Sequence, residues 1–296
     1  MARRRKVFRT GWVFEWVNNF IMLLLALSCL LPFINVLAVS LSDSSAASAG
    51  VVGLWPVKFS LASYEFVFQK VRFMMSMWNS VVRVLLGTTI NMLLTIITAY
   101  PLSKPSREFK GRMGFAWFFV ITMLIGGGLI PSYLITVWTG LRNTIWALII
   151  PGALNVYNVV ILLNFFKQQP RELEESAVLD GAGDWRILWQ IAVPLSMPCL
   201  ATLIIFTTVG HWNEWFSGMI FLDRVEKYPL ATYLHNVLKR PDFDNMHLDE
   251  VQRVMKISNR TLSSAQTMVG ALPIILIYPF LQRYFVKGMM LGSLKG

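Results

Sequence analysis

The sequence predicts an all-α, polytopic membrane protein with six transmembrane helices, and three observations lead to this fold class. The 296 residues are 55% hydrophobic and only 15% charged, which is less charge than a soluble domain carries. The apolar residues come in runs of about 20, the length that crosses a bilayer as a helix. The basic residues gather in short polar segments between these runs. We therefore expect a single transmembrane domain over residues 1–296.

The apolar runs define the expected helices in chain order: about 15–41, 79–102, 113–138, 144–166, 196–222 and 263–286. The first run follows a basic N-terminus, as in a secretory signal, but it is longer than the apolar core of a signal peptide. We expect it to remain as an uncleaved span. Several runs contain glycine or proline, which membrane helices tolerate when neighbours satisfy the freed backbone groups. Such residues suggest helices that bend around a pathway, although close helix packing uses glycine as well.

The short basic segments predict the orientation of the spans. They lie at 3–9, 104–112 and 283–295, and six crossings place all three on the same side. By the positive-inside rule this side is the cytoplasm, so both termini are expected there. The loops at about 43–77 and 223–262 are then extracytoplasmic, and 167–198 is cytoplasmic.

Membrane orientation also explains the net charge of +11. The chain has no stripe of basic residues with interleaved aromatics, which would indicate a nucleic-acid partner. We expect membrane lipid, and no nucleic acid, around this chain.

Residues 167–198 are too polar to cross the bilayer but too patterned for a plain linker. Pro170 suits the start of a helix, where a missing N–H costs nothing. The acidic residues that follow favour the positive end of a helix dipole. The sequence Asp180-Gly181-Ala182-Gly183 is typical of a turn. A first cytoplasmic helix is therefore expected to end near Asp180.

A second short helix is expected from Trp185 to Val193, with Asp184 as its cap and proline residues ending it. The two helices form a helix–turn–helix with an expected apolar face beside Glu175. Such a face suits docking into a groove of a soluble partner. Its members are Leu173, Ala177, Leu188 and Trp189.

The spacing within this segment carries a family resemblance. Glu175-Ser176-Ala177 is followed after three residues by Gly181, after nine more by Ile191, and after one more by Val193-Pro194. This spacing resembles the EAA loop of bacterial ABC importer permeases, Glu-Ala-Ala-x3-Gly-x9-Ile-x-Leu-Pro, from which the chain departs mildly at Ser176 and Val193.

Further segments along most of the chain are similar to the carbohydrate branch of that family. Residues 31–38 followed by 54–56 are similar to permeases for complex or acidic oligosaccharides, of which the alginate importer contains one. The segments similar to the branch as a whole are Asn79-Ser80, 99–103, Asp180-Gly181-Ala182, Trp212-Asn213-Glu214, 227–230 and the tail 288–296.

The resemblance implies the type I ABC importer permease fold and a multi-pass subunit of a bacterial cytoplasmic (inner) membrane that is not an enzyme. Its implied partners are a second, homologous permease in a heterodimer, two ATPase subunits and an extracytoplasmic solute-binding protein. No cofactor is expected on this chain, because ATP and Mg belong to the ATPase subunits. Glu175 is implied as the ion-pairing residue and Gly181 as the turn. The full implied coupling set is Glu175, Ser176, Ala177, Asp180, Gly181, Ile191 and Pro194.

Polar residues inside two apolar runs are candidates for the translocation pathway. Glu214 is costly at the centre of a bilayer, by about 2.5–3.5 kcal/mol, so it should face protein or water. It is flanked by aromatic and hydrogen-bonding groups, which sugar sites combine. Polar residues also hold membrane helices together, and we favour that role for Asn213 and Glu214. The candidates are Asn155, Tyr157, Asn158, His211, Trp212, Asn213, Glu214 and Trp215.

The sequence has three alternative interpretations. A membrane enzyme is disfavoured, because the chain has no HExxH, GxSxG or phosphate-binding loop and no metal-ligand spacing. An ion-driven secondary transporter is disfavoured, because no internal repeat is evident and Glu214 is the one buried acid expected. Import of a neutral oligosaccharide remains an open alternative to an acidic one.

Overall fold

The computed structural model describes residues 10–239 and 259–293, which are helical and contain no strand. The all-α prediction is confirmed for these residues. The basic N-terminal cluster at 3–9, the middle of the loop at 223–262 and the last residues of the tail lie outside the described residues. The described residues divide into two compact units: 10–70 with 259–269, and 71–239 with 270–293. We describe each unit by itself, and the single domain over 1–296 stays a prediction.

The first unit contains α1 (Thr10–Ser40), α2 (Ser44–Ser48) and α3 (Ala62–Gln69). Helix α1 continues through Pro32, and its apolar side chains are exposed over most of its length, as suits a helix surrounded by lipid or by partner helices. Its C-terminal end is buried, where Ala38 and Val39 pack with α2. The Asp43 carboxylate caps α2 by accepting from the backbone N–H of Ser45 at 3.0 Å.

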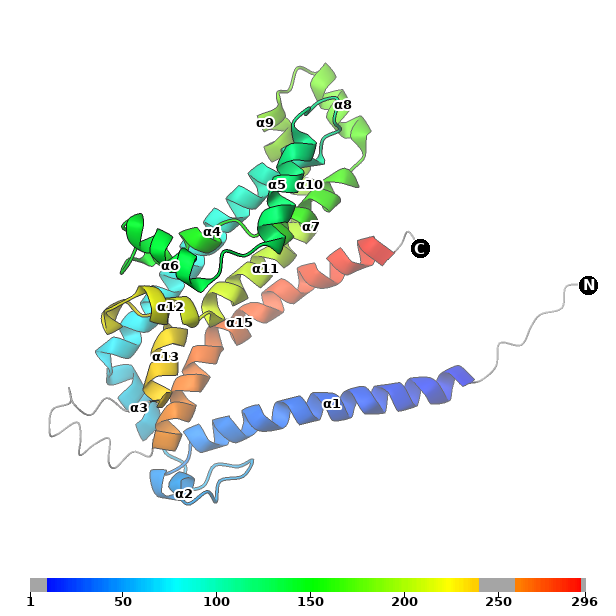
Figure 1. The fold of residues 1–296 in the computed structure, drawn as a ribbon. Coiled ribbons are helices and arrows are strands. Elements are labelled where there is room, and N and C mark those ends of the chain that lie inside the picture. Colours follow the sequence, from blue (N-terminus) through cyan, green and yellow to red (C-terminus); the bar gives the residue numbers. More distant parts are fainter. Residues whose placement is uncertain (1–9, 240–258, 294–296) are drawn as a thin grey trace, which may run out of the picture. The chain divides into compact units, whose positions relative to one another are not determined.

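The second unit is organised around α4 (Val71–Ser103), which packs along α7 (Val156–Lys167) and α11 (Met197–Asn213) (Figure 1). Each of these helices contributes apolar side chains to one core, including Ile96, Leu162 and Leu203. Helix α4 is a single uninterrupted helix, because its one proline, Pro101, lies in the last turn. It therefore forms a rigid axis for this unit.

Glycine and proline break several of the other expected spans. Helices α5 (Arg112–Leu124) and α6 (Leu129–Trp138) meet at 113°, and the break falls on the expected glycine run, where Gly128 adopts φ +82°. The short 3-10 helices η1 (Ile145–Leu148) and η2 (Ile150–Gly152) precede α7 at 48°. Helices that bend at glycine and proline residues were expected from the sequence, and the structure contains them.

The fifth expected span also differs from one straight helix over 196–222. It is divided into α11 and α12 (Phe216–Phe221) at Glu214 and Trp215. The chain continues through η4 (Val225–Lys227) and α13 (Leu230–Lys239), and the last helix is α15 (Asn259–Ser293).

By length and composition, two of the described helices are long and apolar enough to cross a membrane, Phe14–Ser40 and Val71–Ser103. Three bent helix pairs also meet these criteria when each pair is taken as one span. Membrane spanning is thus supported, while six crossings with both termini in the cytoplasm stay a prediction.

Candidate functional site

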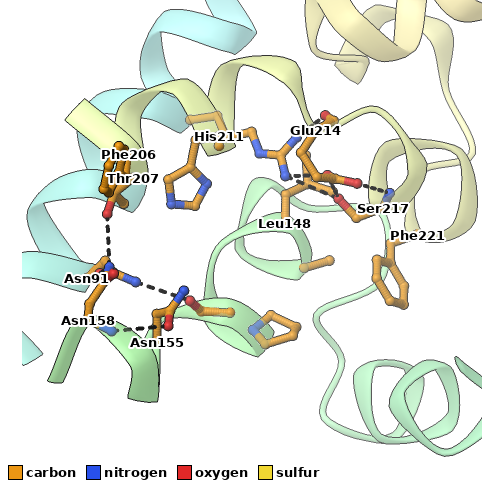
Figure 2. A pocket seen from close by; sticks show the side chains of 15 residues that line it. Asn91, Leu148, Asn155, Asn158, Phe206, Thr207, His211, Glu214, Ser217 and Phe221 are labelled. Atoms are coloured by element: carbon orange, nitrogen blue, oxygen red, sulfur yellow. Dashed lines mark hydrogen bonds and ion pairs between the residues drawn. The ribbon is translucent and has the colours of Figure 1, made fainter. Parts of the chain in front are cut away.

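A pocket of about 410 Å³ lies among α4, the η1–η2 segment, the start of α7, α11 and α12 (Figure 2). Its wall combines amides, hydroxyls and one imidazole with aromatic and aliphatic side chains, and it contains one acid–base pair. The lining residues are Arg83, Asn91, Ala147, Leu148, Pro151, Gly152, Asn155, Asn158, Phe206, Thr207, Gly210, His211, Glu214, Ser217 and Phe221.

The acid–base pair joins α4 to the end of α11. Arg83 is only 2% exposed, and its Nη2 donates to Oε2 of Glu214 at 2.5 Å. Its Nη1 also donates to the backbone carbonyl of Glu214 at 2.7 Å. Ser217 donates to the same carboxylate through its backbone N–H at 2.8 Å and through its hydroxyl. The Glu214 side chain is therefore held from several directions at the break between α11 and α12.

A second polar group on the pocket wall is formed by amides. The buried Nδ2 of Asn158 lies 3.3 Å from the Thr207 hydroxyl and 3.4 Å from Oδ1 of Asn91. Asn155 caps α7 by accepting from the backbone N–H of Tyr157 at 2.9 Å. Figure 2 shows these side chains on the opposite side of the pocket from Glu214. The pocket thus offers hydrogen-bonding groups along one wall and a balanced ion pair at the other.

The pathway candidates divide into two groups. Four of them line the pocket: Asn155, Asn158, His211 and Glu214. The other four candidates do not line the pocket. Of these, Tyr157 is 58% exposed and Asn213 is also exposed. Trp212 is buried and donates to the Gly270 carbonyl at 3.1 Å, and Trp215 stacks on His235 at 3.8 Å. These two tryptophans hold helices of the second unit together.

Arg83 was missed from sequence, although it carries the same signal as Glu214. It is a charged residue inside the second apolar run, where an unpaired charge is costly. An acid and a base in two different apolar runs are candidates for mutual pairing, and the structure brings these two together.

The turn expected at 180–183, within the polar segment 167–198, is confirmed. Helix α8 (Arg171–Leu179) begins after Pro170 and ends at Asp180. Gly181 follows with φ +80°, its N–H bonds the Val178 carbonyl at 3.0 Å, and the next N–H, of Ala182, bonds the Ala177 carbonyl at 2.9 Å. This pair of bonds is the Schellman ending of a helix, which requires a left-handed residue at the position that Gly181 occupies.

The second helix of the segment differs from the expected one over 185–193. Helix α9 is Asp184–Ile187 with Gly183 as N-cap, so Asp184 lies inside the first turn and not at the cap. The chain then widens into a π-helix, η3 (Leu188–Ala192), in which the Val193 N–H reaches the Leu188 carbonyl. Helix α10 (Val193–Leu195) follows. The wide turn precedes Pro194, whose ring cannot donate to an ordinary α-helical bond.

The exposed face of the segment is only partly the one expected. Leu188 is 3% exposed and belongs to the core together with Ile187. Ala177 and Ile191 are half-buried, whereas Leu173 and Trp189 are exposed as expected. The expected face is therefore wrong at Leu188, and it omitted three exposed apolar residues at the tip, Val178, Leu179 and Trp185.

The residues expected to couple to the ATPase differ in exposure, and Ala177 and Ile191 are the half-buried ones among them. Glu175, Ser176, Asp180 and Pro194 are exposed. Neighbouring Glu174 instead forms an ion pair with Nζ of Lys104 at 2.5 Å. Gln169 ties the base of the segment together by donating to the Ala192 carbonyl at 3.0 Å and to the Ser196 hydroxyl at 2.8 Å. Glu175 therefore faces away from the protein while Glu174 anchors α8.

Comparisons with known proteins give one consistent family. The family described as "Binding-protein-dependent transport system inner membrane component" matches residues 1–291. Protein LplC of Bacillus subtilis (strain 168) is 36% identical over 97% of this chain and 97% of its own length. The polygalacturonan/rhamnogalacturonan transport system permease protein YtcP of the same organism is 35% identical over 96% and 99%.

A solved structure is similar over nearly the full chain. It is a bacterial ABC transporter involved in the import of the acidic polysaccharide alginate, and one of its chains matches with a TM-score of 0.86 and 30% identity. The match covers 95% of this chain and 99% of that chain.

Proposed function

Because the chain belongs to the family of binding-protein-dependent transport system inner membrane components, we propose that it is one permease subunit of an importer for acidic oligosaccharides. The chain is a carbohydrate ABC transporter permease of the type I fold, a non-catalytic membrane subunit that works with a solute-binding protein. This family leaves no role for ion-driven secondary transport. Beyond this family-level function, we propose a substrate class, the partner subunits, a sugar-binding pocket and a docking site for the ATPase.

The substrate class rests on one observation, the full-length likeness to a chain of the alginate importer at a TM-score of 0.86. The pocket is suited to sugar, since its amides and hydroxyls match sugar hydroxyls and its aromatic rings match apolar sugar faces. Arg83 is already balanced by Glu214, so the pocket by itself does not select an acid over a neutral sugar. Import of a neutral oligosaccharide is therefore the second candidate.

We assign the partners as a different but homologous permease, two ATPase subunits that bind ATP and Mg, and an extracytoplasmic binding protein that delivers the sugar. The exposed tip of α8 and α9, with Glu175 at its side, docks on an ATPase subunit. Closure of the ATPase pair moves this segment, and the spans around the pocket switch access from one side of the membrane to the other. The assembly resides in the inner membrane of a bacterium.

The test is ATP hydrolysis by the complete assembly in liposomes with its binding protein. Alginate oligomers, polygalacturonan fragments and malto-oligosaccharides are added separately at equal concentration. The proposal expects stimulation by at least one of the first two and none by malto-oligosaccharides. Stimulation by malto-oligosaccharides alone would support the neutral-sugar candidate, and no stimulation by any sugar would contradict the proposed substrates.

A further inference from the structure

An ion pair ties residues 167–198, the segment that we propose to dock on the ATPase and call the coupling segment, to the residue that follows α4. Lys104 directly follows α4, and its Nζ lies 2.5 Å from Oε2 of Glu174 in α8, 70 residues later. The two side chains are 13% and 28% exposed. Among the ion pairs of the described residues, this one joins α8 to the residue at the end of α4.

Lys104 is positioned by the second unit's core rather than by α8. Its ammonium lies 4.5 Å from the centre of the Tyr100 ring, a cation–π contact. Tyr100 is itself buried and packs edge-to-face on Phe166 of α7 at 5.8 Å. Burial opposes the charge of Lys104, but the hydrogen bond and the charge of Glu174 outweigh burial and raise the pKa of Lys104. The lysine therefore stays charged at neutral pH and presents a fixed anchor to α8.

Helix α8 is held from inside by two half-buried residues, Glu174 and Ala177, the second of which packs against the core. None of its residues is buried, and its two neighbouring acids point to different partners. Glu174 turns inward to Lys104, whereas Glu175 is exposed on the surface that we assign to the ATPase. The helix thus lies between a contact with α4 and a contact with a partner subunit.

Helix α4 connects the anchor to the pocket without a break. It runs from Val71 to Ser103 as one helix and supplies Asn91 and Arg83 to the pocket wall. At about 1.5 Å per residue, Asn91 lies roughly 20 Å along the helix from Lys104. A displacement at the Lys104 end is carried to the pocket, because a packed helix moves as a rigid element.

We propose that the Lys104–Glu174 ion pair is a second coupling between the ATPase and the pocket, which makes α4 move together with α8. The covalent route runs from α8 through α9 and η3 into α11. The ion pair adds a non-covalent route into α4, so that both sides of the pocket respond to the same movement. Lys104 and Glu174 are positioning residues, and the inference rests on the proposed function.

The experiment measures sugar transported per ATP hydrolysed by the complete assembly in liposomes, with alginate oligomers as the probe. Glu174→Gln and Glu174→Lys are expected to lower this ratio at least about fivefold, the lower end of typical coupling between sites. Co-purification with the ATPase and basal ATP hydrolysis should be retained, because Glu175 is intact. Glu172→Gln is the matched control: it removes an exposed acid of the same helix and should leave the ratio unchanged.

Exchanging the two charges of the Lys104–Glu174 pair tests whether the pair couples the two helices or only contributes to stability. Lys104→Glu combined with Glu174→Lys should restore the ratio to within about twofold of the wild type, and Lys104→Arg should preserve it, because both keep an opposite pair. An unchanged ratio in Glu174→Lys would overturn the inference. So would failure of the exchanged pair in an assembly that still co-purifies with its ATPase. Failure of the proposed function differs from both, because the wild-type assembly would then respond to none of the sugars.

Discussion

The ion pair in the pocket, Arg83–Glu214, and the ion pair at the coupling segment, Lys104–Glu174, lie in different surroundings. Arg83 in the pocket is 3% exposed in its side chain and lies within an apolar span, so Glu214 is required to compensate its charge. Lys104 follows the end of its span, and the residues beside Glu174 that we assign to the ATPase are on the surface. We infer that substitutions in the pocket change folding and transport together, whereas substitutions in the coupling segment separate them.

The largest loss of stability is expected for Glu214→Ala. This change leaves the buried guanidinium of Arg83 without its counter-ion, which should cost about 3 kcal/mol, the lower end for a broken buried pair because Glu214 is 35% exposed. The midpoint of thermal unfolding in detergent should fall accordingly. Arg83→Met combined with Glu214→Ala is the control and should be more stable than Glu214→Ala alone. Equal stability of the two variants would show that the charge of Arg83 needs no compensation.

Gly87→Ala should have the next largest effect. A Cβ at this position of α4 would lie 2.6 Å from Nε2 of His211, so the imidazole must move toward the pocket. We expect a cost of about 1–2 kcal/mol from overpacking together with weaker sugar-stimulated ATP hydrolysis. Gly114→Ala in α5 meets no atom within 4 Å and provides the matched control. A stability and sugar response equal to those of this control would mean that Gly87 does not set the position of His211.

Gly181→Ala tests whether a change in the coupling segment affects transport more than stability. The position has free space around it but φ +80°, so the cost of about 1 kcal/mol comes from the left-handed backbone alone. We expect a small fall in unfolding temperature and a clear loss of transport, because we propose that the turn positions the tip on the ATPase. Gly183→Ala, at φ −79°, should change stability less. A loss of transport no greater than for Gly183→Ala would remove the turn from the coupling mechanism.

The smallest change in stability is expected for Glu175→Arg. The side chain is exposed, so the free energy of unfolding should change by no more than about 0.5 kcal/mol. Transport should nevertheless be lost and ATPase docking weakened, with the protein still present in the membrane. Glu108→Arg reverses an exposed acid of the second-to-third connection and should transport normally. Normal transport by Glu175→Arg would argue against the coupling assignment.

The features predicted from sequence are those that local chemistry determines. The glycine run at 126–128 breaks a helix and Gly181 forms a helix ending, because few other residues tolerate those backbone angles. The pairs Arg83–Glu214 and Lys104–Glu174 join residues that are 131 and 70 positions apart. Apolar periodicity carries no information on which distant charges meet, so both pairs escaped prediction.

Two expectations for the second helix of the coupling segment are wrong. The sequence places Leu188 on a docking face and Asp184 as the cap of a helix over 185–193. The structure begins the helix at Asp184 with Gly183 as N-cap and widens it into a π-helix from Leu188. Leu188 belongs to the core, and apolarity alone does not show whether such a residue packs inward or docks on a partner.

The π-helix shows why the length of the segment between Gly181 and Ile191, nine residues, matters for the orientation of the tip. Each residue of an α-helix turns the chain by about 100°, so the number of residues between the turn and α11 fixes the direction in which Trp185 and the tip of α8 point. The wide turn at Leu188–Ala192 takes up one more residue than an α-helical turn. Tolerance of the segment to insertion and deletion should therefore be much lower than its tolerance to substitution, since a change of length redirects the whole docking surface at once.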